Sequence, residues 1–217
     1  MLAKLEQFYG PQEPSFPTDP YEFLVWWHCG YPASDAACEK GWKNLVQEVG
    51  IEPRQLLAAK PAQLAKALRP GGMVPEVRAE RIKEIARRVK DELGGDLRTA
   101  LSLPLAKARK ILKSFPGIAD PGADRILLFA GIAPLAAIPS NGVHVLIRIL
   151  QGPEGGNYSA TYREAQRAIA VEVPEKFDAR TRAYLLLKAH GQQTCKRTNP
   201  KCPECPIKLK CEFFTAS

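Results

Sequence analysis

The segment Cys195-Lys-Arg-Thr-Asn-Pro-Lys-Cys202-Pro-Glu-Cys205-Pro-Ile-Lys-Leu-Lys-Cys211 decides how the rest of the chain is interpreted. It holds four of the six cysteines, with six, two and five residues between successive sulfur-bearing positions. Its three prolines exclude a regular helix, because each lacks an N–H group and has a fixed φ. Four thiols on a loop that can wrap around a central object suit a metal ion or an iron–sulfur cluster.

The cysteine spacing alone leaves zinc and an iron–sulfur cluster open. Structural zinc usually takes paired short spacings, whereas this segment has a single Cys-x-x-Cys pair and wider outer spacings. Two disulfides or four buried thiols are the plain alternative, but free cysteines rarely gather this tightly without a ligand. Cys29 and Cys38 lie outside the segment, and we expect them to be ordinary packed thiols.

Composition indicates a globular, basic protein. The 217 residues include 45% hydrophobic residues, which is enough for a substantial core, and the formal net charge is +8. A basic balance favours polyanions through counterion release, although charge alone is weak evidence for such a partner. No apolar run approaches the ~20 residues that span a bilayer, and the first residues contain no signal-peptide core. We therefore expect a soluble cytoplasmic monomer without a membrane partner, in which reduced thiols are available to metal.

The hydrophobic pattern predicts an all-α chain, because no segment alternates with period two. Pro53 and Pro61 each suit the first turn of a short helix. The basic residues of the helix expected at 75–93 are interpreted mainly as a solvated face. The other helices expected in the first half span residues 2–9, 21–28 and 35–49.

A second informative stretch joins two expected helices, 104–114 and 121–130, through the turn Phe115-Pro-Gly-Ile-Ala-Asp120. The plain interpretation is an αα-hairpin that serves packing alone. The functional interpretation is a helix-hairpin-helix, in which backbone N–H groups of the turn meet a DNA phosphate at the start of the second helix. Lys113 and the other basic residues of the first helix could flank that phosphate.

The cysteine pattern resembles the [4Fe–4S] loop of the endonuclease III and adenine-mismatch branch of the helix-hairpin-helix DNA glycosylases. Phe115-Pro-Gly-Ile118 resembles the Leu-Pro-Gly-Val hairpin of that superfamily, and Val77–Ile82 resembles the segment before the hairpin. The resemblance covers roughly residues 20–211. It implies a [4Fe–4S] cluster in place of zinc, held by Cys195, Cys202, Cys205 and Cys211.

The same resemblance implies a base-excision-repair enzyme associated with the nucleoid. Such an enzyme binds duplex DNA, flips out a damaged or mismatched base and cleaves its glycosidic bond. The expected DNA contacts are Lys113, Pro116, Gly117, Ile118 and Ala119. The implied fold has two helical domains around a DNA cleft: a six-helix barrel, residues 20–134, and a cluster domain, residues 1–19 and 135–217.

The chain departs from the family pattern at its catalytic positions. Pro121 stands where the bifunctional members carry a nucleophilic lysine, and proline cannot form a Schiff base. Gly142 stands where the family carries an aspartate two residues before a histidine, here His144. Asp120 and Asp124 are the nearest carboxylates in the motif region. They are the candidate catalytic residues, with His144 as a third candidate that is more readily explained as a hydrogen-bonded structural residue.

Tyr31 stands near the position where relatives insert a polar wedge into the gap left by the flipped base. It could stack there, or it could be a turn residue. Two main hypotheses follow: a monofunctional DNA glycosylase with a rearranged site, or a catalytically silent protein that binds DNA or a lesion. A third, a zinc-stabilised helical interaction protein, requires the resemblance to be chance.

Overall fold

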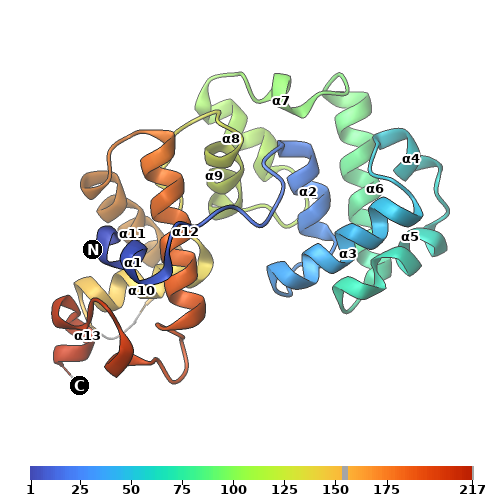
Figure 1. Ribbon diagram of the computed structural model, residues 1–217. Helices are drawn as coiled ribbons and strands as arrows, with labels where there is room; N and C mark the ends of the chain where they lie inside the picture. Colours follow the sequence, from blue (N-terminus) through green and yellow to red (C-terminus); the bar gives the residue numbers. More distant parts are fainter. Residues whose placement is uncertain (153–155, 217) are drawn as a thin grey trace. The chain divides into compact units, whose positions relative to one another are not determined.

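The computed structural model describes residues 1–152 and 156–216, and every regular element in these ranges is a helix (Figure 1). The prediction of an all-α chain is therefore confirmed. The chain divides into two compact units. We call Pro14–Ala119 the middle unit, and Met1–Glu13 with Asp120–Ser217 the terminal unit. In the described ranges, no helix has the length and apolar character needed to cross a membrane.

The division between the units falls inside the hairpin. The first hairpin helix and the turn belong to the middle unit, and the second hairpin helix starts the long part of the terminal unit. The domain limits expected from the sequence, 20–134 and 1–19 with 135–217, keep both hairpin helices together. Those limits stay a prediction.

The middle unit is an array of short helices that begin at prolines or capping residues. The Asp19 side chain accepts hydrogen bonds from the first-turn N–H groups of Tyr21 and Glu22, and Ser34 caps the next helix through Ala37 N–H. The helices are α2 (Pro20–His28), α3 (Asp35–Glu48), α4 (Pro53–Ala58), α5 (Pro61–Leu68), α6 (Pro75–Glu92), α7 (Leu97–Ala100) and α8 (Leu105–Lys113), with a 3₁₀ turn at Arg69–Gly71.

Helix α6 is the centre of the middle unit, and it packs against α2, α4 and α5. Its apolar face, Ile82, Ile85, Ala86 and Val89, is fully buried, as its spacing predicts. The expectation of a solvated basic face is wrong for Arg78, which is 1% exposed. Its guanidinium donates to the carbonyl groups of Cys29, Leu68, Gly72 and Met73, and four acceptors replace the lost water.

The terminal unit has a core of aliphatic side chains between its long helices. Helix α12 packs against α1, α9 and α10, and α10 also packs against α11 and α13. The buried residues Val145, Ile169 and Leu187 belong to one apolar cluster that joins α10, α11 and α12. The helices are α1 (Leu2–Tyr9), α9 (Asp120–Phe129), α10 (Ser140–Leu150), α11 (Tyr158–Glu172), α12 (Phe177–Gln193) and α13 (Glu212–Thr215).

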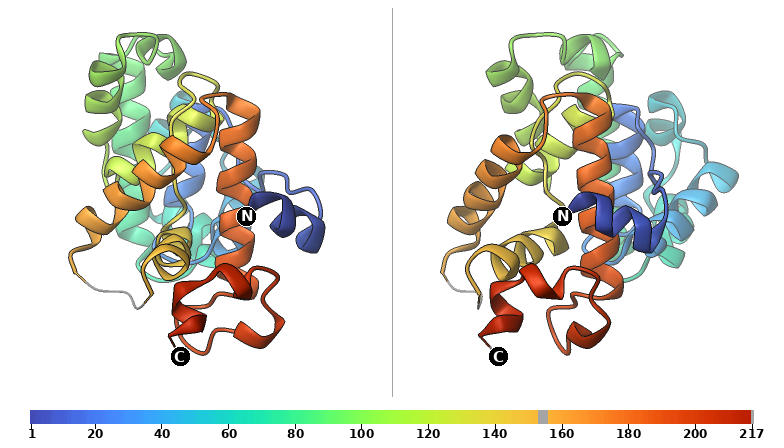
Figure 2. Two further views of the ribbon diagram at one scale, coloured as in Figure 1. Left: turned by 90° about the vertical axis from the view of Figure 1, so that its left-hand side faces the viewer. Right: turned by 60° about the vertical axis from the view of Figure 1, so that its left-hand side comes forward.

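The cysteine segment follows α12 directly and forms an irregular loop with two 3₁₀ turns, Cys202–Glu204 and Lys208–Lys210. Both views of Figure 2 show this loop and α13 at one end of α12. Ile207 is buried against Leu5 and Leu186, so an apolar contact attaches the loop to α1 and α12. The prolines thus have the effect expected of them, since they replace a continuous helix by a loop.

Candidate functional site

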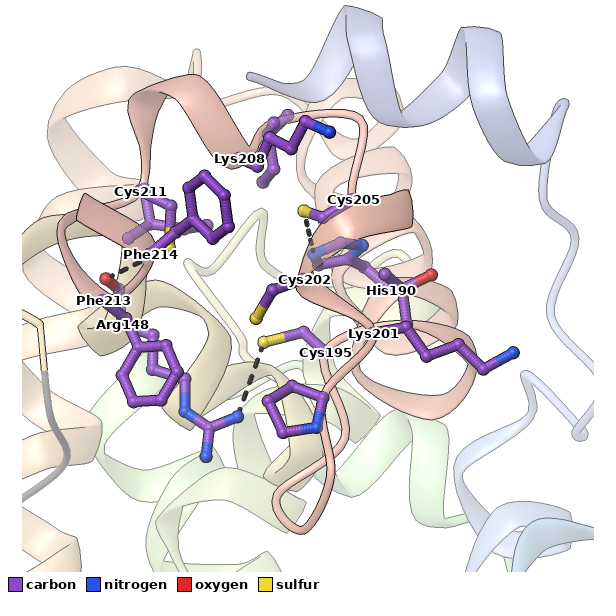
Figure 3. A pocket seen from close by; sticks show the side chains of 14 residues that line it. Arg148, His190, Cys195, Lys201, Cys202, Cys205, Lys208, Cys211, Phe213 and Phe214 are labelled. Atoms are coloured by element: carbon purple, nitrogen blue, oxygen red, sulfur yellow. Dashed lines mark hydrogen bonds between the residues drawn. The ribbon is translucent and has the colours of Figure 1, made fainter. Parts of the chain in front are cut away.

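The four cysteines of the terminal segment line one pocket (Figure 3). Each of these cysteines is half-buried, and Phe213, Phe214 and Ile207 supply much of the apolar wall. The sulfur atoms are spread around the pocket in Figure 3. In the described part of the chain, no three His, Cys, Asp or Glu side chains form a group that could hold a metal ion. Cys29 and Cys38 lie outside this pocket and are buried free thiols. The expectation that they are ordinary packed thiols is therefore confirmed.

Two cationic or aromatic nitrogen groups approach the sulfurs of this pocket. Arg148 Nη1 donates to Cys195 Sγ over 3.7 Å, and His190 Nε2 lies 3.8 Å from Cys205 Sγ. Arg148 also donates to the carbonyl groups of Lys196 and Arg197 at 2.8 and 2.9 Å. One guanidinium therefore fixes the start of the loop and provides a hydrogen-bond donor to a sulfur.

Burial raises the pKa of the Cys195 and Cys205 thiols, although the Arg148 hydrogen bond acts in the opposite direction on Cys195. A thiolate in this pocket therefore needs a strong electrophile to stabilise it. A metal centre is such an electrophile, because metal binding replaces the thiol proton. The chemistry of the residues, four cysteines that line one pocket with nitrogen groups next to two of the sulfurs, fits an iron–sulfur cluster, although the sulfurs lie further apart than the ligands of a single metal ion.

His144 supports the cysteine loop in this structure, and its catalytic role stays a prediction. It is 3% exposed, and its Nε2 lies 2.6 Å from the carbonyl oxygen of Cys195. Because a carbonyl oxygen only accepts, Nε2 must carry the proton. This hydrogen bond joins α10 to the first cysteine, as the structural interpretation of His144 expects.

The hairpin turn has the backbone conformation that its sequence predicts. Gly117 has φ +69°, which favours glycine, and a Cβ there would find only His28 Cε1, at 3.6 Å. His28 Nε2 lies 2.9 Å from the Pro116 carbonyl oxygen, to which it donates. Burial lowers the pKa of His28 to about 4, so the ring is neutral near pH 7. No sequence motif marks this histidine, because it lies 88 residues from its partner.

The structure exposes some of the expected DNA-binding residues and buries others. Lys113, Gly117 and Ala119 are exposed, and Pro116 is half-buried. Ile118 is 6% exposed, and its N–H donates to the Phe115 carbonyl over 3.3 Å, so it serves the turn itself. Tyr31 stacks on Trp27 with ring centroids 4.4 Å apart. The roles of these residues in DNA binding stay predictions.

The two candidate aspartates have opposite environments. Asp120 is the first residue of α9 and is exposed. Asp124 is fully buried, and its Oδ2 accepts hydrogen bonds from Tyr162 Oη and Gln166 Nε2 at 3.2 and 2.8 Å. Asp124 thus connects α9 to α11, whereas Asp120 is open to solvent.

The position of the usual family aspartate is closed. A Cβ on Gly142 would lie 2.8 Å from Pro139 Cγ and 3.2 Å from Leu187 Cβ. The neighbouring Asn141 is committed to the fold, because its Nδ2 donates to the Lys188 carbonyl over 2.9 Å. Neither position supplies a carboxylate, and Pro121 supplies no amine.

Known proteins are similar to this chain in sequence and in fold. Endonuclease III of Thermotoga maritima is 30% identical over 197 residues, which cover 91% of this chain and 84% of the relative. A solved structure of an endonuclease III–DNA covalent intermediate has a TM-score of 0.79 and 18% identity, over 99% of this chain and 94% of that one. A thermostable thymine-DNA glycosylase has a TM-score of 0.78 and 22% identity, over 100% and 95%. No family model matches the chain.

The all-helical fold, the Pro-Gly hairpin and the four-cysteine loop, together with the Thermotoga maritima relative, place the chain in the helix-hairpin-helix DNA glycosylase superfamily. Within that superfamily, the chain belongs to the endonuclease III family.

Proposed function

We propose that the chain binds duplex DNA through the hairpin turn. The observation that carries this proposal is the exposed Gly117 at positive φ, three residues before Asp120, the first residue of α9. A turn without a side chain at this point allows a phosphate to approach the backbone, and a helix N-terminus attracts negative charge. The 31 basic residues against 23 acidic ones support a polyanionic partner.

Substitution of Gly117 tests this DNA contact. Gly117→Val should weaken duplex binding by about tenfold, because one charge-assisted hydrogen bond is worth about 1.5–3 kcal/mol. Gly94 is the matched control, because it lies in the same unit with φ +68° and open space around it. Gly94→Val introduces the same backbone strain away from the hairpin. Equal DNA affinities of the two folded variants would show that the hairpin serves packing alone and does not contact DNA.

The proposed chemistry is monofunctional removal of a damaged or mismatched base. Pro121 excludes an imine at the usual lysine position, so cleavage of the glycosidic bond must use water. The reaction passes through an oxocarbenium-like sugar, which a fixed carboxylate stabilises. Asp120 is the better candidate for that carboxylate, because it is exposed at the hairpin while Asp124 is buried and hydrogen-bonded.

A second candidate function is binding of DNA or a lesion without excision. The closed Gly142 position and the committed Asn141 favour it, since neither supplies the carboxylate that the family uses. The turn and the cysteine pocket are compatible with both functions.

A panel of lesion duplexes, scored by alkaline cleavage, separates the two functions. Monofunctional excision should give strand breaks only after alkali, and Asp120→Asn should abolish them while DNA binding is kept. Borohydride should trap no covalent adduct. Binding of the panel without any excision supports the silent protein, and an adduct trapped on a lysine contradicts both candidates.

We further propose that Cys195, Cys202, Cys205 and Cys211 hold a [4Fe–4S] cluster. The shared pocket and the nitrogen donors to two of the sulfurs support it. When bound, the cluster would stabilise a basic loop and take no part in base excision. Protein purified without oxygen should be brown and contain iron and sulfide, whereas stoichiometric zinc without iron contradicts the proposal. We also expect the protein to be intracellular and monomeric. Sedimentation of the purified protein tests whether it is a monomer.

A further inference from the structure

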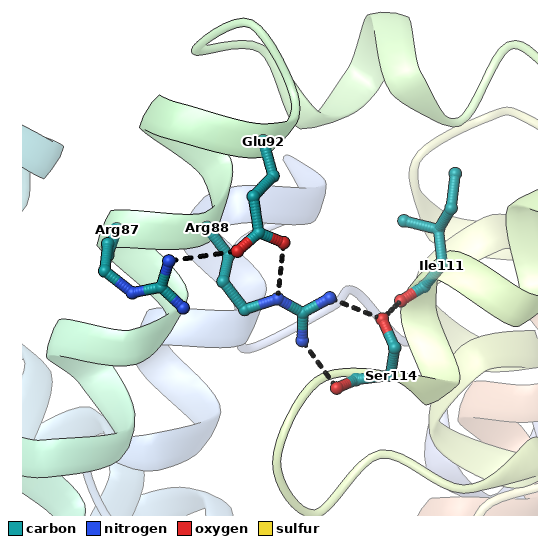
Figure 4. Close-up of polar contacts among 5 residues, drawn as sticks. All are labelled: Arg87, Arg88, Glu92, Ile111 and Ser114. Carbon is teal, nitrogen blue, oxygen red and sulfur yellow. Dashed lines mark hydrogen bonds and ion pairs between the residues drawn. The ribbon is translucent and has the colours of Figure 1, made fainter.

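One arginine of α6 is bound to the end of the first hairpin helix (Figure 4). Arg88 Nη1 donates to the Ser114 carbonyl over 2.6 Å, and Nη2 donates to Ser114 Oγ over 2.7 Å. The guanidinium carbon also lies 4.6 Å from the centroid of the Phe115 ring. The Arg88 side chain is 16% exposed, whereas that of its neighbour Arg87 is 51% exposed.

These contacts supply a hydrogen-bond donor to a carbonyl group at the C-terminus of α8. Ser114 is the C-terminal capping residue of α8, and its carbonyl belongs to the last turn, where carbonyl groups have no N–H donor within the helix. A cation at that end also interacts favourably with the helix dipole. Ser114 Oγ in turn donates to the Ile111 carbonyl over 2.6 Å, so the guanidinium fixes a side chain that is already oriented.

Glu92 orients the guanidinium from its other side. Arg88 Nε donates to Glu92 Oε2 over 3.2 Å, and Arg87 Nη1 donates to Glu92 Oε1 over 3.0 Å. Both arginines therefore share one carboxylate, and only Arg88 contacts the hairpin in Figure 4. This difference provides a matched pair of variants with the same charge.

His28 fixes the same turn two residues further along. It is fully buried in α2, and its Nε2–H donates to the Pro116 carbonyl over 2.9 Å. The carbonyl groups of Ser114 and Pro116 are thus occupied by groups of the middle unit. No hydrogen bond within the described ranges uses the N–H of Gly117 or Ala119. The carbonyl groups of Ser114, Phe115 and Pro116 therefore have partners, while two N–H donors of the turn are available.

We propose that Arg88 and His28 are positioning residues, which fix the 114–117 segment so that the N–H groups of Gly117 and Ala119 are ready to bind a DNA phosphate. The proposal rests on the DNA-binding function proposed above. Neither residue contacts the phosphate itself. They keep the turn ordered in the absence of DNA. A flexible turn would have to be ordered on binding, and that ordering would weaken the affinity.

Affinity for a plain duplex, measured over a range of salt concentrations, tests the role of Arg88. Arg88→Met should weaken binding by about tenfold, the loss expected for one phosphate hydrogen bond. Arg87→Met removes the same charge and the same Glu92 partner, and it should weaken binding by less than about threefold. Both variants should show the same dependence of affinity on salt, because both remove one charge.

Two further variants separate positioning from direct contact. Arg88→Lys keeps the charge and loses the two-pronged contact, so it should bind as weakly as Arg88→Met with the wild-type salt dependence. Ser114→Ala removes no charge and should weaken binding several-fold, with little further loss when it is combined with Arg88→Met. His28→Phe should also weaken binding without a change in salt dependence, because the ring is neutral.

The outcomes distinguish this inference from the function on which it rests. If Gly117→Val binds DNA as well as wild type does, the hairpin function itself fails. If Gly117→Val binds weakly but Arg88→Met equals Arg87→Met in affinity, positioning by Arg88 is wrong. Rescue by Arg88→Lys, or a salt slope about one unit smaller for Arg88→Met than for Arg87→Met, would also overturn it, since Arg88 would then contact phosphate directly. Circular dichroism spectra would establish that each variant is folded.

Discussion

Tyr162 in α11 donates its hydroxyl hydrogen to Asp124 in α9, with 3.2 Å between Oη and Oδ2. Burial raises the pKa of Tyr162, and the nearby Asp124 charge raises it further, so the phenol remains a donor. Gln166 donates to the same oxygen over 2.8 Å. Within the terminal unit, the second hairpin helix is thus joined to α11 by a buried carboxylate that sequence alone had placed among the catalytic candidates.

Asp124→Ala should lower the free energy of unfolding by about 2–4 kcal/mol, because it leaves the buried Tyr162 donor and the half-buried Gln166 donor unsatisfied and creates a small cavity. Asp124→Asn keeps an acceptor oxygen and should lower the free energy of unfolding by about 1 kcal/mol. Urea unfolding measures both values, with Asp120→Ala as the exposed control, for which we expect about 1 kcal/mol or less. Loss of excision in a fully stable Asp124→Asn variant would instead assign the chemistry to Asp124.

Gly142→Asp restores the usual family carboxylate, but it should destabilise the protein and should not increase excision. A Cβ there would lie 2.8 Å from Pro139 Cγ, so the side chain forces a shift that costs about 1–3 kcal/mol. Ser140→Asp is the matched control, because it places a carboxylate at the exposed first residue of α10, where the helix dipole favours it. Thermal unfolding should separate the two variants. A stable Gly142→Asp variant with increased excision would show that the backbone adapts.

The features predicted correctly from sequence are local ones. The Pro-broken cysteine loop, the Gly117 turn and the apolar face of α6 each depend on residues a few positions apart, whose spacing carries the signal. Arg78 was misassigned because a charge pattern cannot show that distant carbonyl groups surround a guanidinium. The contacts of His28 with Pro116 and of Arg88 with Ser114 join residues 88 and 26 positions apart. They use backbone carbonyl groups, which every residue possesses, so no motif marks them.

Arg148→Met should loosen the start of the cysteine loop. It removes hydrogen bonds to two backbone carbonyl groups and a contact with the Phe213 ring, 4.7 Å from the guanidinium carbon. We expect the free energy of unfolding to fall by about 2–3 kcal/mol, a loss typical of hydrogen bonds to a charged group. Faster proteolysis of the 195–211 segment should accompany it, and protein that carries the proposed cluster should lose iron faster. Arg163→Met removes an exposed charge from α11 and should change neither rate.

Stability should fall between about pH 6.5 and pH 4 because His28 is buried in its neutral form. Its pKa is about 4 in the folded chain, owing first to burial and also to the charges of Arg81 and Arg78. Its ordinary value is about 6.5. The unfolded chain therefore binds more protons in this window, so stability that is present above pH 6.5 is lost as the pH falls.

Urea unfolding at pH 7 and pH 5 measures the contribution of His28. The loss of unfolding free energy between these pH values should be about 2 kcal/mol smaller in His28→Phe than in wild type. A residual pH dependence should remain, because burial also lowers the pKa of His190 to about 4. Identical pH dependence in the variant and wild type would show that His28 does not titrate in this window.

Val74→Asn should stabilise the middle unit. Val74 has φ +49° directly before α6, a left-handed conformation that costs a β-branched residue roughly 1–2 kcal/mol. The strain persists because Arg78 holds the preceding carbonyl groups of Gly72 and Met73. Since the Val74 side chain is 56% exposed, its removal sacrifices little packing. Asparagine accepts this conformation and can cap the helix, so we expect a gain of about 1 kcal/mol.

The matched control for this gain is Met73→Asn, which changes an adjacent side chain that is 87% exposed and has no positive φ. It should alter the free energy of unfolding by less than about 0.5 kcal/mol. Val74→Gly relieves the same strain but leaves the unfolded chain more flexible, so its gain should be smaller than that of Val74→Asn. If Val74→Asn lowers the urea midpoint at an unchanged denaturant slope, the valine side chain contributes more through packing than its backbone conformation costs.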